Sequence, residues 1–202
     1  MSLEQSRVES EIAGPTPLVR SCPTFLNLLG QFYAALPEPL SLEAVLVAPA
    51  VIPEPYRRLL VHANDMTSTL ERFYGEQVEL SVLHRWVDDD ILSRHIVLIG
   101  AQSRRPVEYG AIRIHLPAMD ETARQKVLEC RLPLGGILKS QGVAHKGCPG
   151  GFFTVQANDL IRRALQLQGQ PWLYGRCNCL SNAAGRTIAE VVEILPNVQG
   201  QI

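Results

Sequence analysis

Apolar residues recur at helical spacing in the first third of the chain. Over 25–36 they fall every three or four positions until Pro37, which predicts a helix that ends there. A second helix is predicted over 66–74, with Asn64 or Asp65 as its N-cap and Gly75 as its stop. Between these two, residues 38–63 mix apolar runs with prolines, which predicts short helices joined by kinks rather than a strand.

From Gln77 onward the period of the pattern changes from helical to twofold. Apolar and polar residues alternate over 77–87, and two further strand-like runs follow over 93–100 and 107–117. The acidic run at 88–90 is typical of a solvated turn, and a polar loop separates the second run from the third. These segments predict a three-stranded antiparallel meander.

Helical patterns return after the meander. Asp120 can cap a helix that breaks at Pro133 and resumes as a second short helix across 134–139. The segment 144–151, which contains His145 and Cys148, is typical of a turn-rich loop rather than a pair of metal ligands.

The last part of the chain predicts one more helix and a hairpin. Asn158 or Asp159 can cap a helix through Leu167, and two strands flank the Gly-containing loop at 181–185. Helices grouped around consecutive hairpins, without β-α-β alternation, predict an α+β fold in which helices pack around an antiparallel sheet.

Length and composition favour one globular domain. The chain has 202 residues, 46% of them hydrophobic, which is ordinary for a protein with a sizeable core. Residues 1–20 are polar and contain a glycine and two prolines, so we expect a flexible N-terminal arm followed by a folded domain over 21–202.

The balance of charged residues argues against polyanionic partners. Lys and Arg total 19 against 20 for Asp and Glu, so a net charge of −1 gives no general reason to expect nucleic acid or a membrane surface as partner. The N-terminus lacks a cationic start followed by an apolar core, and no stretch approaches the roughly 18 apolar residues of a membrane span. We therefore expect a cytoplasmic protein.

The cysteines favour reduced thiols. Five cysteines, an odd number at irregular spacing, do not suggest a disulfide framework. Cys177 and Cys179 would share one face of a strand, but the second pair of ligands that a structural metal site needs is missing. We expect small apolar strand residues here and no metal.

Charged residues embedded in strand patterns are the best candidates for chemistry. The sequence carries no glycine-rich nucleotide loop, nucleophile elbow or zinc-protease motif, so no cofactor is indicated. Arg94, Arg113 and Glu193, however, occupy otherwise apolar strand faces. Each has an ordinary alternative, because Arg94 can reach solvent, Arg113 can pair with Glu108, and Glu193 is close to the strand end. Together they describe a pocket for an aromatic carboxylate, with guanidinium groups to bind carboxylates and a carboxylate to orient a ring hydroxyl.

Six segments resemble one family in the same order. The runs "NDMTSTLERFYGEQVEL", "SRHIVLIG", "RIHLP", "LPLGGIL", "LYGRCNCL" and "AEVVEILP" are similar to the chorismate pyruvate-lyase family, including its subgroup of 4-hydroxybenzoate synthetases. The likeness covers roughly residues 60–196. It implies a single α+β domain whose internal pocket is closed by helical flaps. It also implies cofactor-free elimination of pyruvate from chorismate to give 4-hydroxybenzoate, a precursor of quinones or secondary metabolites.

The resemblance also implies roles for individual residues. Arg94 would be catalytic, and Arg113, Leu134, Gly135 and Met66 would bind the substrate.

The position of the family's glutamate depends on the alignment of the last strand. Counted back from Pro196 it falls on Val192, and a shift of one residue places it on Glu193, with Glu190 as the competing candidate. We expect Glu193 to be the catalytic carboxylate, acting on the oxygen that becomes the phenol.

A non-catalytic function is the alternative. The same fold resembles the effector-binding domain of certain bacterial transcription regulators, which bind small molecules. The first 60 residues have too many prolines and too few cations for a DNA reader, so a stand-alone module that binds an aromatic carboxylate is the better form of this alternative. A lyase for another chorismate-derived compound is a further possibility on the same residues.

Overall fold

Three consecutive strands form the predicted meander. In the computed structural model, which describes residues 28–30, 33 and 42–198, β2 (Val78–Asp88), β3 (Ile91–Gly100) and β4 (Pro106–His115) pair in order and antiparallel. The acidic run turns the chain between β2 and β3, as its composition predicts. The alternation of apolar and polar residues from Gln77 therefore marks these strands correctly.

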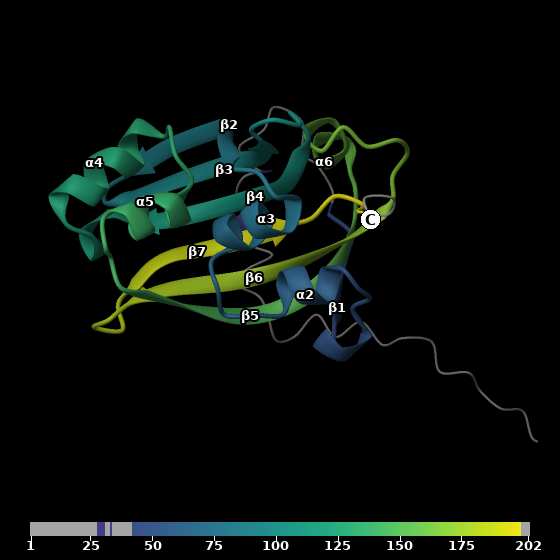
Figure 1. The fold of residues 1–202 in the computed structure, drawn as a ribbon, viewed down its shortest axis with the longest axis horizontal. Coiled ribbons are helices and arrows are strands. Elements are labelled where there is room, and N and C mark those ends of the chain that lie inside the picture. Colours follow the sequence, from purple (N-terminus) through teal and green to yellow (C-terminus); the bar gives the residue numbers. More distant parts are fainter. Residues whose placement is uncertain (1–27, 31–32, 34–41, 199–202) are drawn as a thin grey trace, which may run out of the picture.

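A second meander completes the sheet. β5 (His145–Gln156), β6 (Trp172–Asn182) and β7 (Thr187–Ile194) also pair in order, and β7 pairs antiparallel with β4. With β1 (Ala44–Val47) on the edge beside β5, the strands lie in the order β1-β5-β6-β7-β4-β3-β2. The predicted α+β fold with an antiparallel sheet is confirmed (Figure 1).

Two local predictions are wrong. Residues Ala44–Val47 form a strand, because they pair with Phe152–Val155 of β5. Within the described part of that region, the helical segments are a 3-10 turn at Pro49–Val51 and α2 (Tyr56–Leu60). The segment around Cys148 is the first half of β5 rather than a loop. A register shift between Pro149 and Gly151 accommodates the proline, which cannot donate to the ladder.

The predicted helix caps are mostly confirmed. The Asp65 side chain accepts a hydrogen bond from the Ser68 backbone N–H at 2.8 Å, and α3 (Met66–Tyr74) ends at Gly75 with φ of 70°. Asp120 caps α4 (Glu121–Glu129) in the same way, and α5 (Leu134–Ser140) follows the break.

The remaining helices agree with the sequence only in part. Asn158 caps α6, which runs over Asp159–Ala164 and so ends before the predicted Leu167. The predicted arm over 1–20 and most of the first predicted helix lie outside the described residues; residues 28–30 and 33 are helical.

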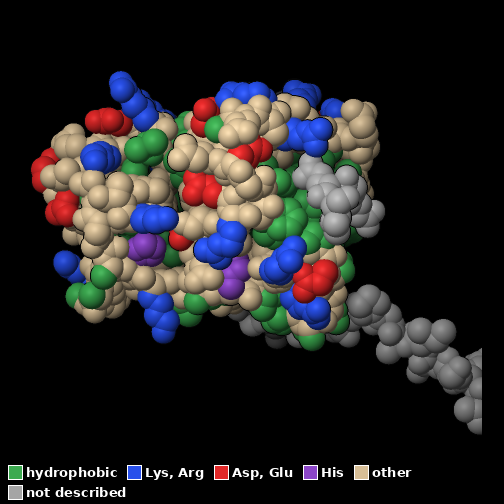
Figure 2. Space-filling model, in the orientation of Figure 1, with side chains coloured by type: hydrophobic (Ala, Val, Ile, Leu, Met, Phe, Trp, Pro, Cys, Tyr) green, Lys and Arg blue, Asp and Glu red, His purple; other side chains and the backbone are tan. Residues whose placement is uncertain are grey.

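Helices α2, α3, α4 and α5 lie on one face of the sheet (Figure 1). Two apolar clusters form beneath them, one around α4 and α5 and the other around α2 and α3. A third cluster lies on the opposite face, where Ile161 of α6 packs with Tyr109 and Ala111. Basic and acidic side chains are interspersed on the surface shown in Figure 2, in keeping with the net charge. None of the described helices is long and apolar enough to cross a membrane.

Candidate ligand pocket

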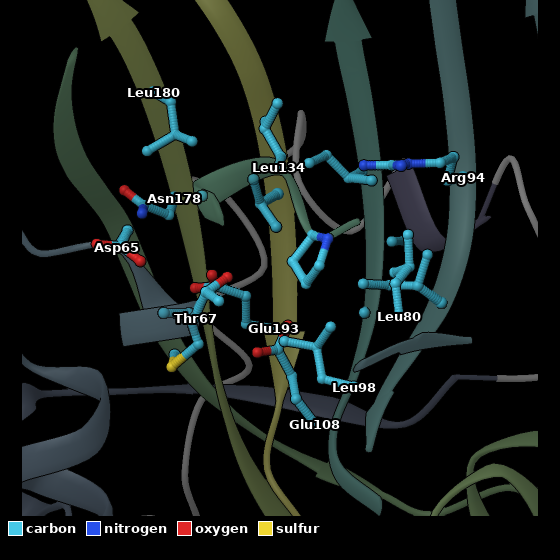
Figure 3. Close-up of a pocket in the computed structure, with 18 residues that line it drawn as sticks. Asp65, Thr67, Leu80, Arg94, Leu98, Glu108, Leu134, Asn178, Leu180 and Glu193 are labelled. Atoms are coloured by element: carbon cyan, nitrogen blue, oxygen red, sulfur yellow. The ribbon is translucent and has the colours of Figure 1, made fainter. Parts of the chain in front are cut away.

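A pocket with an apolar lining and a few polar groups lies where the two clusters of the helix face meet (Figure 3). Strands β2, β3, β4, β6 and β7 form its floor, and the N-terminal ends of α3 and α5 cover it. The lining residues are Asp65, Met66, Thr67, Leu80, Arg94, Ile96, Leu98, Glu108, Gly110, Ala111, Ile112, Pro133, Leu134, Gly135, Asn178, Leu180, Val191 and Glu193.

Arg94 places a buried positive charge in this pocket. Arg94 is 1% exposed, and its Nε and Nη1 have no hydrogen-bond partner among the described residues. Burial lowers the pKa of Arg94, while the electrostatic interaction with the Cys130 sulfur and hydrogen bonding to it act in the opposite direction. Arginine stays protonated in proteins, so two nitrogens of a charged guanidinium are left for an anion. Arg85, opposite Arg94 on β2, adds positive charge nearby.

A carboxylate lies deeper in the pocket, held by a second buried arginine. Arg176 on β6 is 0% exposed, and its Nε donates to Oε2 of Glu193 on β7. Its Nη1 donates to the carbonyls of Leu60 at 3.1 Å and His62 at 3.0 Å, and its Nη2 donates to the carbonyl of Asn64 at 3.4 Å. Arg176 therefore neutralises Glu193 and ties it to the connection between α2 and α3.

His62 completes this arrangement as a neutral ring. Its Nε2 lies 2.7 Å from the carbonyl of Leu59, so this nitrogen must carry the proton and donate. Its Nδ1 then accepts from Arg176 Nη1 at 3.2 Å. Burial, followed by the positive charge of Arg176, lowers the pKa of His62, which agrees with this assignment.

Glu108 is a second carboxyl group in the pocket, and its environment favours the protonated form. It is 3% exposed, and its Oε2 has no hydrogen-bond partner among the described residues. Burial, together with the negative charge of Glu193, raises the pKa of Glu108 well above its usual range, against the opposing effect of Arg176. A neutral Glu108 can donate a hydrogen bond where Glu193 can only accept one.

The polar groups therefore lie at separate places around an apolar lining. In Figure 3, Arg94 lies away from Glu108 and Glu193, and Asn178 of β6, whose Oδ1 has no partner in the described part of the chain, lies across the pocket from Arg94. Leu80, Leu98 and Leu134 supply apolar surface between these groups. Such an arrangement suits a flat apolar ring with an anionic group at one end and a hydroxyl at the other.

The structure brings five of the six predicted site residues together. Arg94, Glu193, Met66, Leu134 and Gly135 all line the pocket. Their functional roles remain predictions.

Arg113 is not among the lining residues. The register pairs Arg94 with Ile112, so Arg113, one position further along β4, projects from the opposite face of the sheet. There its Nη1 lies 3.8 Å from Oε2 of Glu190, at a partly exposed site. The structure thus places Glu193 in the pocket and the competing Glu190 outside it.

Sequence reasoning missed Glu108, Arg176 and Asn178 as pocket or supporting residues. Glu108 alternates in phase with Ile112 and not with Arg113, so the twofold period alone argues against the pairing that the sequence suggested. Arg176 stands in an apolar strand and carries the same signal as Arg94. Asn178, by contrast, gives no such signal, since a buried amide in a strand has many ordinary explanations.

The covering segments close tightly over the pocket. The cavity measures about 50 Å³, and a single aromatic ring needs on the order of 150 Å³. Gly135 explains the close approach of α5 to α3, because a Cβ at this position would lie 2.9 Å from Asp65 Oδ1 and 3.0 Å from Thr67 Oγ1. Entry of a ring therefore requires α3 and α5 to separate, as in a pair of flaps.

Gly135→Ala is expected to disturb this closure and to lower stability by about 1–3 kcal/mol. Asp65 cannot simply turn away, because the same Oδ1 caps α3. Gly136→Ala is the matched control: a Cβ there meets nothing within 4 Å, so it should be neutral or stabilise the helix by up to about 1 kcal/mol. Urea unfolding of the two variants measures the difference, and equal stabilities would contradict the close packing of the flaps.

Glu108→Gln is expected to become progressively more stable than the parent as the pH rises. The unfolded state releases the Glu108 proton near the usual pKa of 4.5, whereas the folded state retains it because its pKa is raised. Stability of the parent therefore falls above that pH, by up to about 1.4 kcal/mol per pH unit, until the folded pKa is reached. Glutamine does not titrate. Urea unfolding between about pH 5 and pH 8 tests this, and parallel stability curves for the two proteins would contradict a protonated Glu108.

Several solved structures are similar to this chain in fold. The effector domain of PhnF from Mycobacterium smegmatis aligns with a TM-score of 0.51 and 9% identity over 67% of this chain and 90% of that domain. PhnF from the same organism aligns with a TM-score of 0.50 and 9% identity, over 68% of this chain and 65% of that one. The ligand-binding domain of a putative GntR-family transcriptional regulator from Bordetella bronchiseptica aligns with a TM-score of 0.45 and 11% identity, over 60% of this chain and 86% of that domain.

The two PhnF structures establish the fold. This chain has the fold of the PhnF effector domain, which is the arrangement that the sequence analysis associated with chorismate lyases. No protein-family model matches the sequence, and no curated protein matches it either.

Proposed function

We propose that this protein is a binding module for a small cyclic carboxylate that carries a ring hydroxyl, of the 4-hydroxybenzoate type. The observation that carries the proposal is Arg94, whose buried guanidinium keeps two nitrogens without a partner in a pocket lined by apolar residues. A buried guanidinium with two nitrogens left unsatisfied is destabilising, and a ligand carboxylate would offset this cost with charge-assisted hydrogen bonds.

The second requirement of the ligand comes from the two glutamates. A hydroxyl both donates and accepts, so it can accept from neutral Glu108 while it donates to Glu193, whose carboxylate pairs with Arg176. An amine or a second carboxylate at this place meets one of the two glutamates with the wrong hydrogen-bonding character. The pair therefore favours a hydroxyl over other substituents.

The likeness in fold supports the non-catalytic form of this proposal, since PhnF uses the fold as an effector domain.

Calorimetric titration tests the proposal with three ligands that differ in one group each: 4-hydroxybenzoate, benzoate and phenol. We expect 4-hydroxybenzoate to bind tightest. Benzoate, which leaves the two glutamates without a partner, and phenol, which leaves Arg94 unpaired, should each bind about tenfold or more weakly. Equal affinity for benzoate and 4-hydroxybenzoate would remove the role of the glutamates, and the absence of binding by all three would overturn the proposal.

A lyase acting on chorismate is the second candidate function. What favours it is that five of the six residues singled out by the family resemblance line one pocket, namely Arg94, Met66, Leu134, Gly135 and Glu193. The sixth, Arg113, lies on the opposite face of the sheet. In that reaction Arg94 would bind a carboxylate. Glu193 would act on the oxygen that becomes the phenol, and aromatisation of the ring supplies the driving force.

Incubation with chorismate separates the two candidates. Equal formation of 4-hydroxybenzoate and pyruvate, lost in Glu193→Gln, would establish the lyase. Binding of 4-hydroxybenzoate without any turnover of chorismate would leave the binding module.

A further inference from the structure

Two cysteines stand directly opposite each other on neighbouring strands. The register of β5 and β6 pairs Cys148 with Cys179, and both are thiols in this structure. Directly opposed residues of an antiparallel pair project from the same face of the sheet, with Cα atoms about 4.5–5.5 Å apart. A disulfide requires Cα atoms about 4.4–6.8 Å apart, so the backbone already holds the two residues at a suitable separation.

The pair lies on the face of the sheet opposite the pocket, where reagents can reach it. Cys148 is exposed and Cys179 is partly exposed. Lys146, two residues before Cys148, is exposed on the same face and attracts anionic reagents. The Cys179 thiol donates to Thr187 Oγ1 at 3.9 Å, which orients it at the surface of the β6–β7 pair.

Cys177 does not share these properties, although it is closer to Cys179 in the sequence. It is 2% exposed and belongs to the apolar cluster of its face. Its register partner on β5 is Gly151, beyond the register shift. The C-x-C spacing is thus less informative than the cross-strand position of Cys148, which only the register reveals.

We propose that Cys148 and Cys179 form a redox-active pair that a low-molecular-weight disulfide, such as oxidised glutathione, converts to an intramolecular disulfide. The thiolate of exposed Cys148 attacks one sulfur of the reagent, giving a mixed disulfide and releasing one reagent thiolate. The Cys179 thiolate then attacks the Cys148 sulfur and releases the second. Two S–H bonds are lost and one S–S bond forms, while the reagent is reduced to two thiols that take up the two protons.

The disulfide would form directly behind the pocket. Asn178, next to Cys179, lines the pocket, and a Cβ on Gly147, next to Cys148, would lie 2.6 Å from the carbonyl of Ala63 in the α2–α3 connection. Oxidation therefore fixes the strand pair that supports this connection. Exposed disulfides belong to the labile class, so reducing thiols should reverse the reaction.

The test is to treat the full chain with oxidised glutathione, block remaining thiols with an alkylating reagent and digest with trypsin. Cleavage after Lys146, Arg162, Arg176 and Arg186 places Cys148 on one peptide and both Cys177 and Cys179 on another. We expect these two peptides to be linked, and dithiothreitol to separate them. Cys177→Ser should leave the linkage intact, whereas Cys148→Ser should abolish it and leave Cys179 free or singly glutathionylated.

Several results would overturn the proposal. These are stable glutathione adducts on Cys148 and Cys179 in the parent, a linkage that Cys177→Ser removes, a disulfide between two copies of the chain, or no reaction of either thiol. Circular dichroism of each serine variant checks that the fold is retained, so that a lost linkage reports on the thiol.

Discussion

Arg176→Met is expected to destabilise the protein by about 3–5 kcal/mol, because it leaves a buried carboxylate without its counter-charge. Glu193 would then stand beside Glu108 with no positive partner, and the carbonyls of Leu60, His62 and Asn64 would lose their donor. For a chain of this length each kcal/mol lowers the melting temperature by about 2–4 °C, so a fall of roughly 6–20 °C should be observed.

Arg104→Met is the control for this experiment. Arg104 also pairs with a glutamate, Glu79, but the two side chains are 62% and 55% exposed. A surface ion pair of this kind contributes about 1 kcal/mol or less. If Arg176→Met unfolded at the same temperature as Arg104→Met, the buried pair could not be what holds the α2–α3 connection to the sheet.

Arg94→Met is expected to have the opposite effect on stability and to weaken binding of the carboxylate ligand about tenfold or more. The substitution keeps the apolar stem of the side chain and removes a buried charge with two unpartnered nitrogens. Replacement of poorly compensated buried charge by an apolar side chain stabilises proteins by about 1–4 kcal/mol. Weaker binding together with a gain in stability would identify Arg94 as a residue retained for ligand binding.

Urea unfolding and calorimetry measure the two effects, and the neighbouring arginine supplies the control. Arg85 is exposed on β2, opposite Arg94, and donates to the carbonyl of Leu128 at 3.1 Å. Arg85→Met should change stability little. A loss of stability in Arg94→Met would show that Arg94 is a structural residue with partners in the folded chain, which contradicts the account of the pocket.

Local signals in the sequence predict most of the fold, and they fail where distant pairing decides. Asp65 and Gly75 delimit α3 because capping depends on neighbouring residues alone. The strand at Ala44–Val47 exists through its pairing with β5, more than a hundred residues later, and the surrounding prolines hide it. The strand around Cys148 is concealed in the same way by Pro149 and its glycines.

The sequence likewise predicts part of the candidate site and misses the part that depends on strand register and burial. A charged residue on an apolar strand face is visible in sequence, and Arg94 and Glu193 reach the pocket as expected. Whether Arg113 lies on the same face of the sheet as Arg94 depends on the register of β3 and β4, which no local pattern specifies. The protonated state of Glu108 depends on burial beside Glu193, so it emerges only from the folded chain.

A calorimetric comparison of 4-hydroxybenzoate with 4-hydroxybenzamide, using the parent protein and Arg94→Met, tests whether Arg94 binds the carboxylate of the ligand. The two ligands have nearly the same shape and the same hydroxyl, and they differ in the charge that Arg94 is proposed to bind. We expect the parent to prefer the carboxylate by about tenfold or more, and Arg94→Met to show no preference. The same preference in both proteins, or no binding of either ligand to the parent, would contradict the assignment of Arg94 as the carboxylate site.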